Sequence, residues 1–310
     1  MKKNILFALF ICCAQLGAQQ IPDRSFDPPV VSPAYPFGKG SLVLLDEAHH
    51  NFHTAEGRYL VFAEILKKDG YRVMSGTQAF TPALPKEVKI LVIANALNAI
   101  NADGNDGRTR WKLPVPSAFT ADEIRSVNEW VKAGGSLFLI ADHHPFPGAS
   151  FDLAKSFGFT FYNGFATDTL SDSYPYRVSG VALFSKKDGS LAIHPLTENV
   201  EQVATFTGQA FQIPEKATSL LTLGKQYKLL LPDTAWVFGQ HTQRLPAKGF
   251  SQGAVLEYGK GRVAIFGEAA MFSGQLKGQE QEPMGLNAPF AGDNIPFLLN
   301  MIHWLDYDKK

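Results

Sequence analysis

TADEIRSVNEWVKAGGSLFLIAD, residues 120–142, carries a helix signal followed directly by a strand signal. Thr120 and Glu123 have the spacing of a capping box, in which each side chain binds a backbone amide at the start of a helix. A glycine pair then favours the helix end, and residues 136–142 form an apolar run typical of a buried strand. The stretch predicts a helix over 120–135 that leads straight into a strand.

The same alternation of strand and helix extends along most of the chain. Strands apolar on both faces are typical of a parallel sheet that helices cover on both sides. Between about residues 159 and 250 the rhythm weakens into short alternating segments, which predict a β-rich insertion. The other predicted elements are strands at 41–46, 71–75, 88–95, 253–258 and 261–268, and helices at 55–70, with Thr54 as N-cap, and 294–307.

The composition bounds the class of protein. The chain has 310 residues, of which 45% are apolar and 19% charged, and this balance suits a well-packed globule. Basic and acidic residues number 29 each, and no basic stripe is evident. Nucleic acid is therefore excluded as an expected partner.

The N-terminus has the pattern of a secretory signal peptide. Two lysines precede an apolar stretch over residues 5–14, and small residues follow, with cleavage expected after Ala18. The apolar stretch is too short to span a bilayer, and no later segment is long enough to do so. We expect residues 1–18 to be removed and the protein to be periplasmic or secreted.

Both cysteines of the chain, Cys12 and Cys13, lie inside this signal. A lipoprotein would use one of them, but the bulky Phe10 and Ile11 before them disfavour lipid attachment. The mature chain is then free of thiols and disulfides. Residues 19–38 form a proline-rich extended leader, and residues 39–310 form a single folded domain.

Three stretches carry a family pattern: LVLLDEAHHNFHTAEGRY (42–59), EIRSVNEWVKAGGSLFLIAD (123–142), and GKGRVAIFGEAAMFSG (259–274) with DNIPFLLNMIHWL (293–305). They resemble the class I glutamine amidotransferase-like superfamily, in particular a branch related to the domain of gliding-motility ABC-transporter auxiliary proteins. The resemblance implies a flavodoxin-like three-layer sandwich with a mostly parallel sheet, and an envelope or transporter partner.

The chain departs from that superfamily at the catalytic nucleophile. True amidotransferases place a cysteine on a sharp turn after a strand, whereas the loop here holds Asp142, His143 and His144. Glutamine hydrolysis through a thiol is therefore excluded, and the fold alone supplies no other function.

Two loops at strand ends carry the candidate chemistry. They are DEAHHNFHT (46–54) and ADHHPFPG (141–148), and they hold five of the eight histidines. In open parallel sheets, ligands bind beyond the carboxyl ends of the strands, so we expect both loops to contribute to one site.

Histidine and carboxylate side chains are the usual ligands of zinc, iron or manganese. His49 and His53 are four residues apart, and Pro145 favours an extended backbone at His144, which turns neighbouring side chains to opposite sides. The expected metal ligands are His49, His53, His143 and Asp142.

The remaining candidates surround these ligands. Expected catalytic carboxylates, including general bases, are Asp46, Glu47, Asp142 and Glu268. The expected substrate rim is His50, Asn51, His144 and Phe146.

Three interpretations of this constellation stay open: a metal site, a metal-free ligand or catalytic site, and a structural role for the loops. The corresponding functions are a secreted hydrolase of a small molecule or carbohydrate-type substrate, a non-catalytic binding or transporter-associated module, and a structural envelope component. The chain has no glycine-rich phosphate loop after its first strand and no G-x-S-x-G elbow, which disfavours nucleotide binding and serine hydrolysis.

Overall fold

The structure is a computed structural model. It describes residues 20–102, 111, 113–172, 174, 177–178 and 180–307. The expected signal peptide, residues 1–18, lies outside the described residues.

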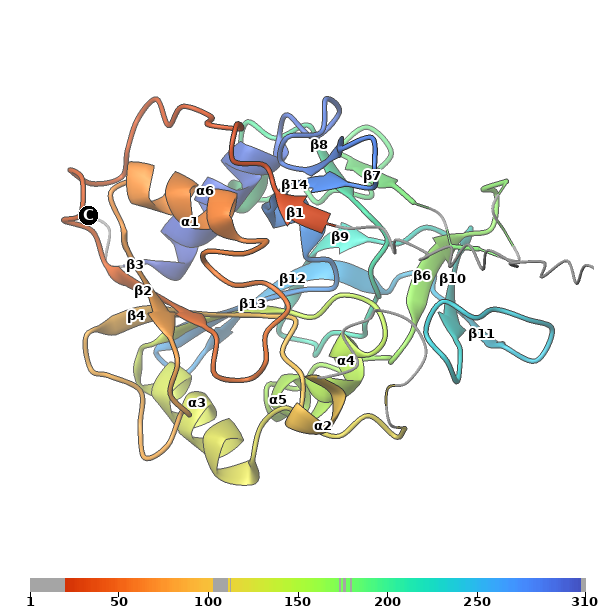
Figure 1. The fold of residues 1–310 in the computed structure, drawn as a ribbon, viewed down its shortest axis with the longest axis horizontal. Helices are drawn as coiled ribbons and strands as arrows, with labels where there is room; N and C mark the ends of the chain where they lie inside the picture. Colours follow the sequence, from red (N-terminus) through yellow and green to blue (C-terminus); the bar gives the residue numbers. More distant parts are fainter. Residues whose placement is uncertain are drawn as a thin grey trace, which may run out of the picture.

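A seven-stranded sheet forms the centre of the protein (Figure 1). Neighbouring strands are parallel from β3 through β2, β4 and β5 to β13, whereas β12 and β9 add an antiparallel edge. In sheet order the strands are β3 Arg72–Gly76, β2 Leu42–Asp46, β4 Val88–Ala94, β5 Ser136–Ile140, β13 Gly261–Phe266, β12 Ser251–Tyr258 and β9 Thr218–Thr222.

Helices cover both faces of the central sheet because its strands are apolar on both sides. In β5, Phe138 and Ile140 belong to the core that α1 and α6 complete, whereas Leu137 and Leu139 belong to the core of α3 and α5. Each such side chain contributes about 1.5–3 kcal/mol when fully buried. The helices are α1 Leu60–Lys68, α6 Asn294–Leu305, α3 Ala121–Ala133 and α5 Phe151–Ser156.

The helix and strand predicted over residues 120–142 are confirmed. Thr120 Oγ1 accepts the Glu123 amide proton at 3.3 Å, and Glu123 Oε2 accepts that of Thr120 at 3.0 Å. Gly134 ends the helix at a φ of 129°, a conformation that favours glycine.

The start of α1 differs from the predicted helix over 55–70. The amides of Gly57 and Tyr59 both donate to the Thr54 carbonyl at 3.1 Å, so this segment forms turns and the helix begins only at Leu60. The predicted N-cap at Thr54 is wrong, since the N-cap residue is Tyr59 and makes no side-chain capping bond.

The predicted mostly parallel, flavodoxin-like three-layer sandwich is wrong. The fold is a mixed α/β arrangement, because three further sheets are all antiparallel and the main sheet itself ends in antiparallel strands. Their short segments pair with one another instead of continuing the βα rhythm. The sheets are β1 Gln20–Pro22 with β14 Gly274–Lys277 and β15 Glu282–Gly285; β11 Gln243–Pro246 with β10 Tyr227–Leu231 and β6 Phe165–Asp168; and β7 Ala182–Ser185 with β8 Gln202–Thr205.

The described part of the proline-rich leader is attached to the folded body. β1 pairs with β14, the Ala34 amide donates to Asp69 at 2.7 Å, and the Tyr35 hydroxyl donates to Asp306 at 2.7 Å. These contacts hold the leader against residues far along the chain.

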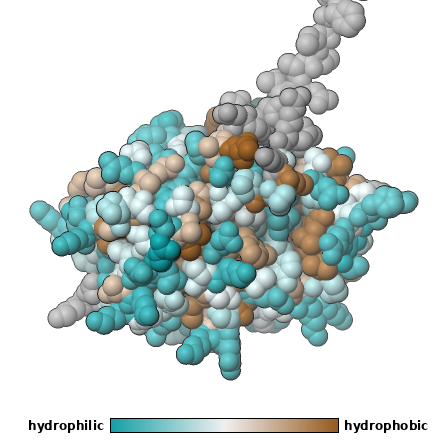
Figure 2. All heavy atoms as spheres, turned by 90° about the horizontal axis from the view of Figure 1, so that it is seen from below, coloured by the Kyte–Doolittle hydropathy of each residue, from teal (hydrophilic) through white to brown (hydrophobic). Residues whose placement is uncertain are grey.

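The remaining helical elements are short. They are α2 Ala99–Ala102, α4 Phe146–Ala149, and the 3₁₀ turns η1 Pro195–Thr197 and η2 Ala270–Phe272. Among the described residues, no helix has the length and apolar character needed to cross a bilayer. Hydrophobic residues on the face seen in Figure 2 lie in separate spots among hydrophilic ones.

Candidate functional site

Buried polar side chains meet at the carboxyl edge of the central sheet. His53 lies in the loop after β2, Asn95 follows β4, Asp142 lies just beyond β5, and Glu268 lies just beyond β13. Their exposed fractions are 3%, 1%, 8% and 0%. We call these four residues the polar centre. Of the sequence-predicted site residues, it contains His53, Asp142 and Glu268.

Asn95 connects the two predicted loops and fixes the protonation of His53. Its Oδ1 accepts the Asp142 amide proton at 2.8 Å, so its Nδ2 is the atom that lies 3.2 Å from His53 Nδ1. Because Nδ2 can only donate, His53 Nδ1 accepts and the ring proton of the neutral imidazole is on Nε2. Among the described residues, this buried Nε2–H has no hydrogen-bond partner.

Burial keeps His53 neutral. Burial lowers the pKa of the His53 imidazole well below its usual range, and the nearby charges of Arg58 and His143 lower it further. The side chain therefore offers an uncharged N–H donor with nothing to bind. Such unpaired buried groups are rare in native proteins.

The two carboxyl groups of the polar centre are held by backbone amides. Asp142 accepts from the amides of His143 at 2.7 Å and Ala269 at 3.4 Å. Glu268 accepts from those of Ala270 at 2.7 Å and Met271 at 2.8 Å. The start of the η2 turn thus positions both groups side by side.

These two carboxyl groups bind protons more readily than isolated ones. Burial raises the pKa of Asp142, although the charge of His143 and two backbone hydrogen bonds oppose the shift. Burial, followed by the charge of Asp142, raises the pKa of Glu268 to about 8. Two buried carboxylates side by side repel, so the pair retains one proton at neutral pH.

His143 lies at the edge of the polar centre. Its Nε2 is 3.9 Å from Asp142 Oδ1, and its Nδ1 donates to the His144 carbonyl at 2.9 Å. The ring stacks on Phe165 and meets Trp236 edge-on, with centroid distances of 4.7 and 4.5 Å. His144 makes separate contacts, with Asn163 and the ring of Trp111.

Asp46 and His49 belong to a second cluster, together with Glu123 of α3. His49 Nδ1 lies 2.9 and 3.0 Å from the two Asp46 oxygens, and its Nε2 lies 2.9 Å from Glu123 Oε1. All three side chains are buried. We call this cluster the histidine bridge.

The histidine bridge is an ion-pair arrangement. Burial lowers the pKa of His49, but the hydrogen bonds and charges of Asp46 and Glu123 outweigh it and raise that pKa above its usual value. Burial raises the pKa of Glu123, but hydrogen bonds from Thr120 and His49 outweigh it and lower that pKa. Both ring nitrogens of His49 donate to carboxylates, so neither has a lone pair free for a metal.

Two other candidates hold the first loop in shape. Glu47 Oε1 accepts from the Ala55 amide at 2.8 Å and from the Ser75 hydroxyl at 2.9 Å. Asn51 Oδ1 accepts the His49 amide proton at 3.2 Å. The contacts of both side chains are within the loop and its neighbours.

The last two predicted rim residues differ in exposure. His50 is exposed and adopts a φ of 48°. Phe146 is buried, and its ring lies 5.5 Å from that of Phe52 and 6.0 Å from that of His143. Phe146 therefore packs between the two predicted loops.

No family model matches the chain, and no curated protein matches it. Solved structures do resemble it. The N-terminal domain of mmIFT52 is 15% identical, covers 85% of this chain and 97% of that domain, and has a TM-score of 0.57. This likeness shows the fold alone.

Two further solved structures are described as ThuA-like proteins. The one from Bacteroides uniformis is 13% identical over 90% of this chain and 94% of that protein, with a TM-score of 0.43. The one from Parabacteroides merdae is 10% identical over 86% of this chain and 90% of that protein, with a TM-score of 0.44.

The residues present do not fit a metal centre of the predicted kind. The described part of the chain contains no group of three His, Cys, Asp or Glu side chains arranged to hold a metal ion. His49 is occupied by two carboxylates, while His53 Nδ1 accepts from Asn95. The predicted set of His49, His53, His143 and Asp142 therefore does not assemble around one point.

Sequence reasoning missed three residues that shape the site. Asn95 had a usable signal, because it is the polar residue directly after the buried run VKILVIA, just as Asp142 follows a buried strand. Glu123 was recognised only as a helix cap. Arg58 had no signal; its guanidinium lies 3.7 Å over the Phe52 ring, and burial lowers its pKa to about 10.

The polar centre combines the elements of acid–base chemistry. A carboxyl pair that shares one proton can give a proton and take another, as paired acids with separated pKa values do in enzymes. His53 adds a neutral N–H that can bind a developing negative charge. Asp142 is the member of the pair that is partly exposed, with 11% of its side chain accessible.

Proposed function

We propose that this chain is an exported hydrolase of the class I glutamine amidotransferase-like superfamily, without glutaminase activity, that acts at the polar centre without a bound metal. The substrate would be a small molecule or a glycan-type compound outside the cytoplasm. Sequence resemblance supports the superfamily, and the signal pattern of residues 1–18 supports export to the periplasm or beyond. The two cysteines fall inside that signal, so thiol catalysis is not part of the proposal.

The observation that carries the proposal is the buried Nε2–H of His53, which has no partner among the described residues, on a ring that Asn95 links to Asp142 of the carboxyl pair. A donor left unpaired in a folded protein costs about 1–3 kcal/mol. A bound substrate oxygen that accepts this proton would remove that cost.

In the proposed reaction, the Asp142 carboxylate takes a proton from a water molecule. The water oxygen forms a bond to the electrophilic carbon of the substrate, and His53 Nε2–H stabilises the negative charge that develops. As the bond from that carbon to the leaving group breaks, the proton held by Glu268 passes to the leaving group. Proton exchange with water then restores the pair.

The test is hydrolysis of a panel of alkyl esters and O-acetylated sugars by the purified mature chain, because an alkoxide leaving group needs the proton that Glu268 would supply. Asp142→Asn and Glu268→Gln should each lower the rate by about 10²–10⁴-fold, the usual contribution of a positioned acid or base. His50→Asn is the matched control, because it changes a neighbouring exposed histidine to a residue that tolerates the same positive φ. Circular dichroism confirms that the variants are folded.

The panel also distinguishes the hydrolase from the alternative function, which is a non-catalytic ligand-binding or transporter-associated envelope module. Glu268 favours that alternative, because both of its oxygens already accept backbone amides and it is 0% exposed. If the wild-type chain hydrolyses no member of the panel, or if Asp142→Asn keeps the full rate, the hydrolase proposal is overturned.

A further inference from the structure

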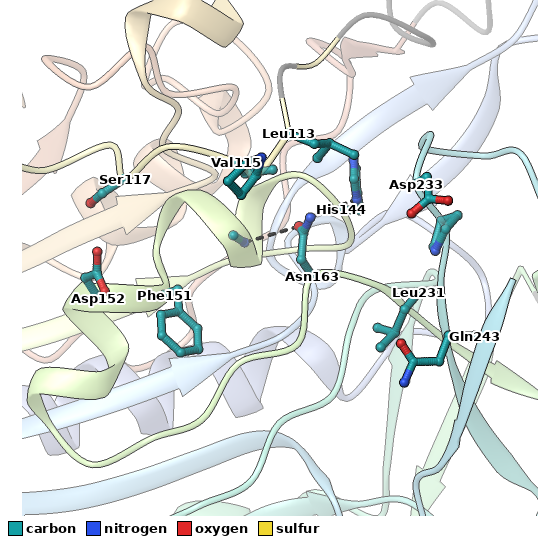
Figure 3. Close-up of a pocket in the computed structure, with 13 residues that line it drawn as sticks. Leu113, Val115, Ser117, His144, Phe151, Asp152, Asn163, Leu231, Asp233 and Gln243 are labelled. Carbon is teal, nitrogen blue, oxygen red and sulfur yellow. Dashed lines mark hydrogen bonds between the residues drawn. The ribbon is translucent and has the colours of Figure 1, made fainter.

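A cavity lies beside the loop that follows β5. It has a volume of about 450 Å³ and is lined by residues of the segment 113–117, of α4 and α5, and of the segment around the end of β10 (Figure 3). This volume falls within the range of about 300–1,000 Å³ that is typical of small-molecule sites. We call this cavity the His144 groove.

His144 supplies a hydrogen-bond donor to the groove. Asn163 Oδ1 accepts the Gly148 amide proton at 3.2 Å, which assigns Asn163 Nδ2 as the atom 2.9 Å from His144 Nδ1. The imidazole of His144 therefore accepts at Nδ1 and carries its proton on Nε2. No hydrogen bond to its Nε2 is found within the part of the chain that is described, and the residue is 1% exposed. This Nε2 is not among the fully buried atoms that lack a partner.

A smaller cavity of about 20 Å³ adjoins the same histidine and is lined by Trp111, Asp233, Thr234 and Ala235. His144 lines both spaces. Burial lowers the pKa of His144 to about 4, so the ring stays uncharged at neutral pH.

The polar lining of the groove restricts the chemistry of a ligand. Asp152 and Asp233 are the charged residues among the described residues that line it, and these include no Lys or Arg. An anion would meet two carboxylates and a neutral ring, while an ammonium group could not accept from His144 Nε2–H. A hydroxyl group meets both demands, because it accepts from the imidazole and donates to a carboxylate or to the Gln243 amide. The apolar walls, such as Leu231 and Phe151, suit carbon faces.

We propose that the His144 groove binds a small uncharged polyhydroxyl compound, of the size of a mono- or disaccharide. His144 donates to one hydroxyl group of the ligand, and Asp233 and Gln243 accept from others. The proposal does not rest on catalysis at the polar centre, because the contacts of His143 belong to that centre and those of His144 to the groove.

The test is isothermal titration calorimetry of the mature chain with glucose, galactose, maltose and cellobiose, with glucuronate and glucosamine as charged probes. We expect saturable binding of at least one neutral sugar, at least tenfold tighter than either charged probe. Asp233→Leu and Gln243→Leu, both at exposed positions, should weaken it at least tenfold. Gln240→Leu, an exposed glutamine outside the lining, is the matched control and should bind like wild type.

Two further variants make the result decisive. His144→Phe removes the ring N–H donor and should abolish binding, whereas Asp142→Asn, in the polar centre, should leave it intact. The proposal is overturned if no neutral sugar binds, if a charged probe binds as tightly, or if Asp233→Leu and Gln243→Leu both bind like wild type. Loss of binding in Asp142→Asn would also overturn it, since the ligand would then occupy the polar centre.

Discussion

Replacing His49 by alanine should destabilise the protein severely, because it leaves two buried carboxylates without their shared cation. The exposed fractions of Asp46 and Glu123 are 0% and 5%, and the imidazole lies 2.9 Å from each. Removing one partner of a buried ion pair costs about 3–5 kcal/mol. That is a large part of the roughly 5–15 kcal/mol by which domains are usually stable.

The imidazole also packs between two aromatic rings. Its centroid is 4.6 Å from that of Phe80 and 4.7 Å from that of Phe119. Alanine leaves a cavity there, which places the expected loss toward the upper end of the range. The assay is urea denaturation of wild type, His49→Ala and the exposed-site control His50→Asn, which should lie within about 0.5 kcal/mol of wild type.

The pH dependence of this loss has a defined sign. The folded-state pKa of His49 is raised above its usual 6.5, so its stabilising contribution is complete below that value and is lost as pH rises through the folded-state pKa. The stability difference between wild type and His49→Ala should therefore shrink at alkaline pH. A loss below about 1 kcal/mol at pH 6, or a difference that grows with pH, would refute an ion-paired His49.

Four further predictions follow from other parts of the chain. Glu268→Gln should flatten the dependence of stability on pH. Between about pH 4.5 and about pH 8, Glu268 keeps its proton in the folded wild type but loses it in the unfolded chain, so wild type loses stability as pH rises. Urea midpoints that change equally with pH in both proteins would argue against this. Untagged mature protein, incubated with zinc and desalted, should retain less than roughly a tenth of an equivalent by mass spectrometry, and a stoichiometric amount would contradict the metal-free site. Thr120→Ala should cost about 0.5–2 kcal/mol in urea denaturation while Thr120→Ser costs little, since serine keeps the cap; equal losses would contradict the capping role. Expression in a Gram-negative host should give a periplasmic or secreted product that N-terminal sequencing shows to start after Ala18, and an intact cytoplasmic product would contradict export.

Local signals in the sequence predicted the elements that depend on local contacts. The helix at 120–135 was recognisable because Thr120 and Glu123 are neighbours on its first turn, and the structure confirms their bonds. The start of α1 was misjudged because the turns around Thr54 compete with helix formation over the same residues. The fold class was wrong because antiparallel pairing of short strands depends on partners far apart in the chain, such as β1 with β14.

The same distinction applies to the candidate site. Parallel strands present their carboxyl ends at one edge of a sheet, and this rule predicted that Asp142 and Glu268 lie near each other. In the structure the amide of Ala269, the residue after Glu268, donates to Asp142. The same rule could not predict the partners of the two histidines. His49 contacts Glu123, which is 74 residues away, whereas His53 contacts Asn95. Helical spacing between the two histidines was uninformative because their segment is not helical.

The most direct test of the polar centre is the pH dependence of hydrolysis by wild type and Glu268→Gln. If Glu268 donates a proton to the leaving group, the wild-type rate on an alkyl ester falls as pH rises through about 8, the pKa to which burial and Asp142 raise this carboxyl. Glu268→Gln should be slower by about 10²–10⁴-fold at pH 7 and should lack that fall. A folded Glu268→Gln protein with the wild-type rate and the wild-type profile would contradict acid–base catalysis at the polar centre.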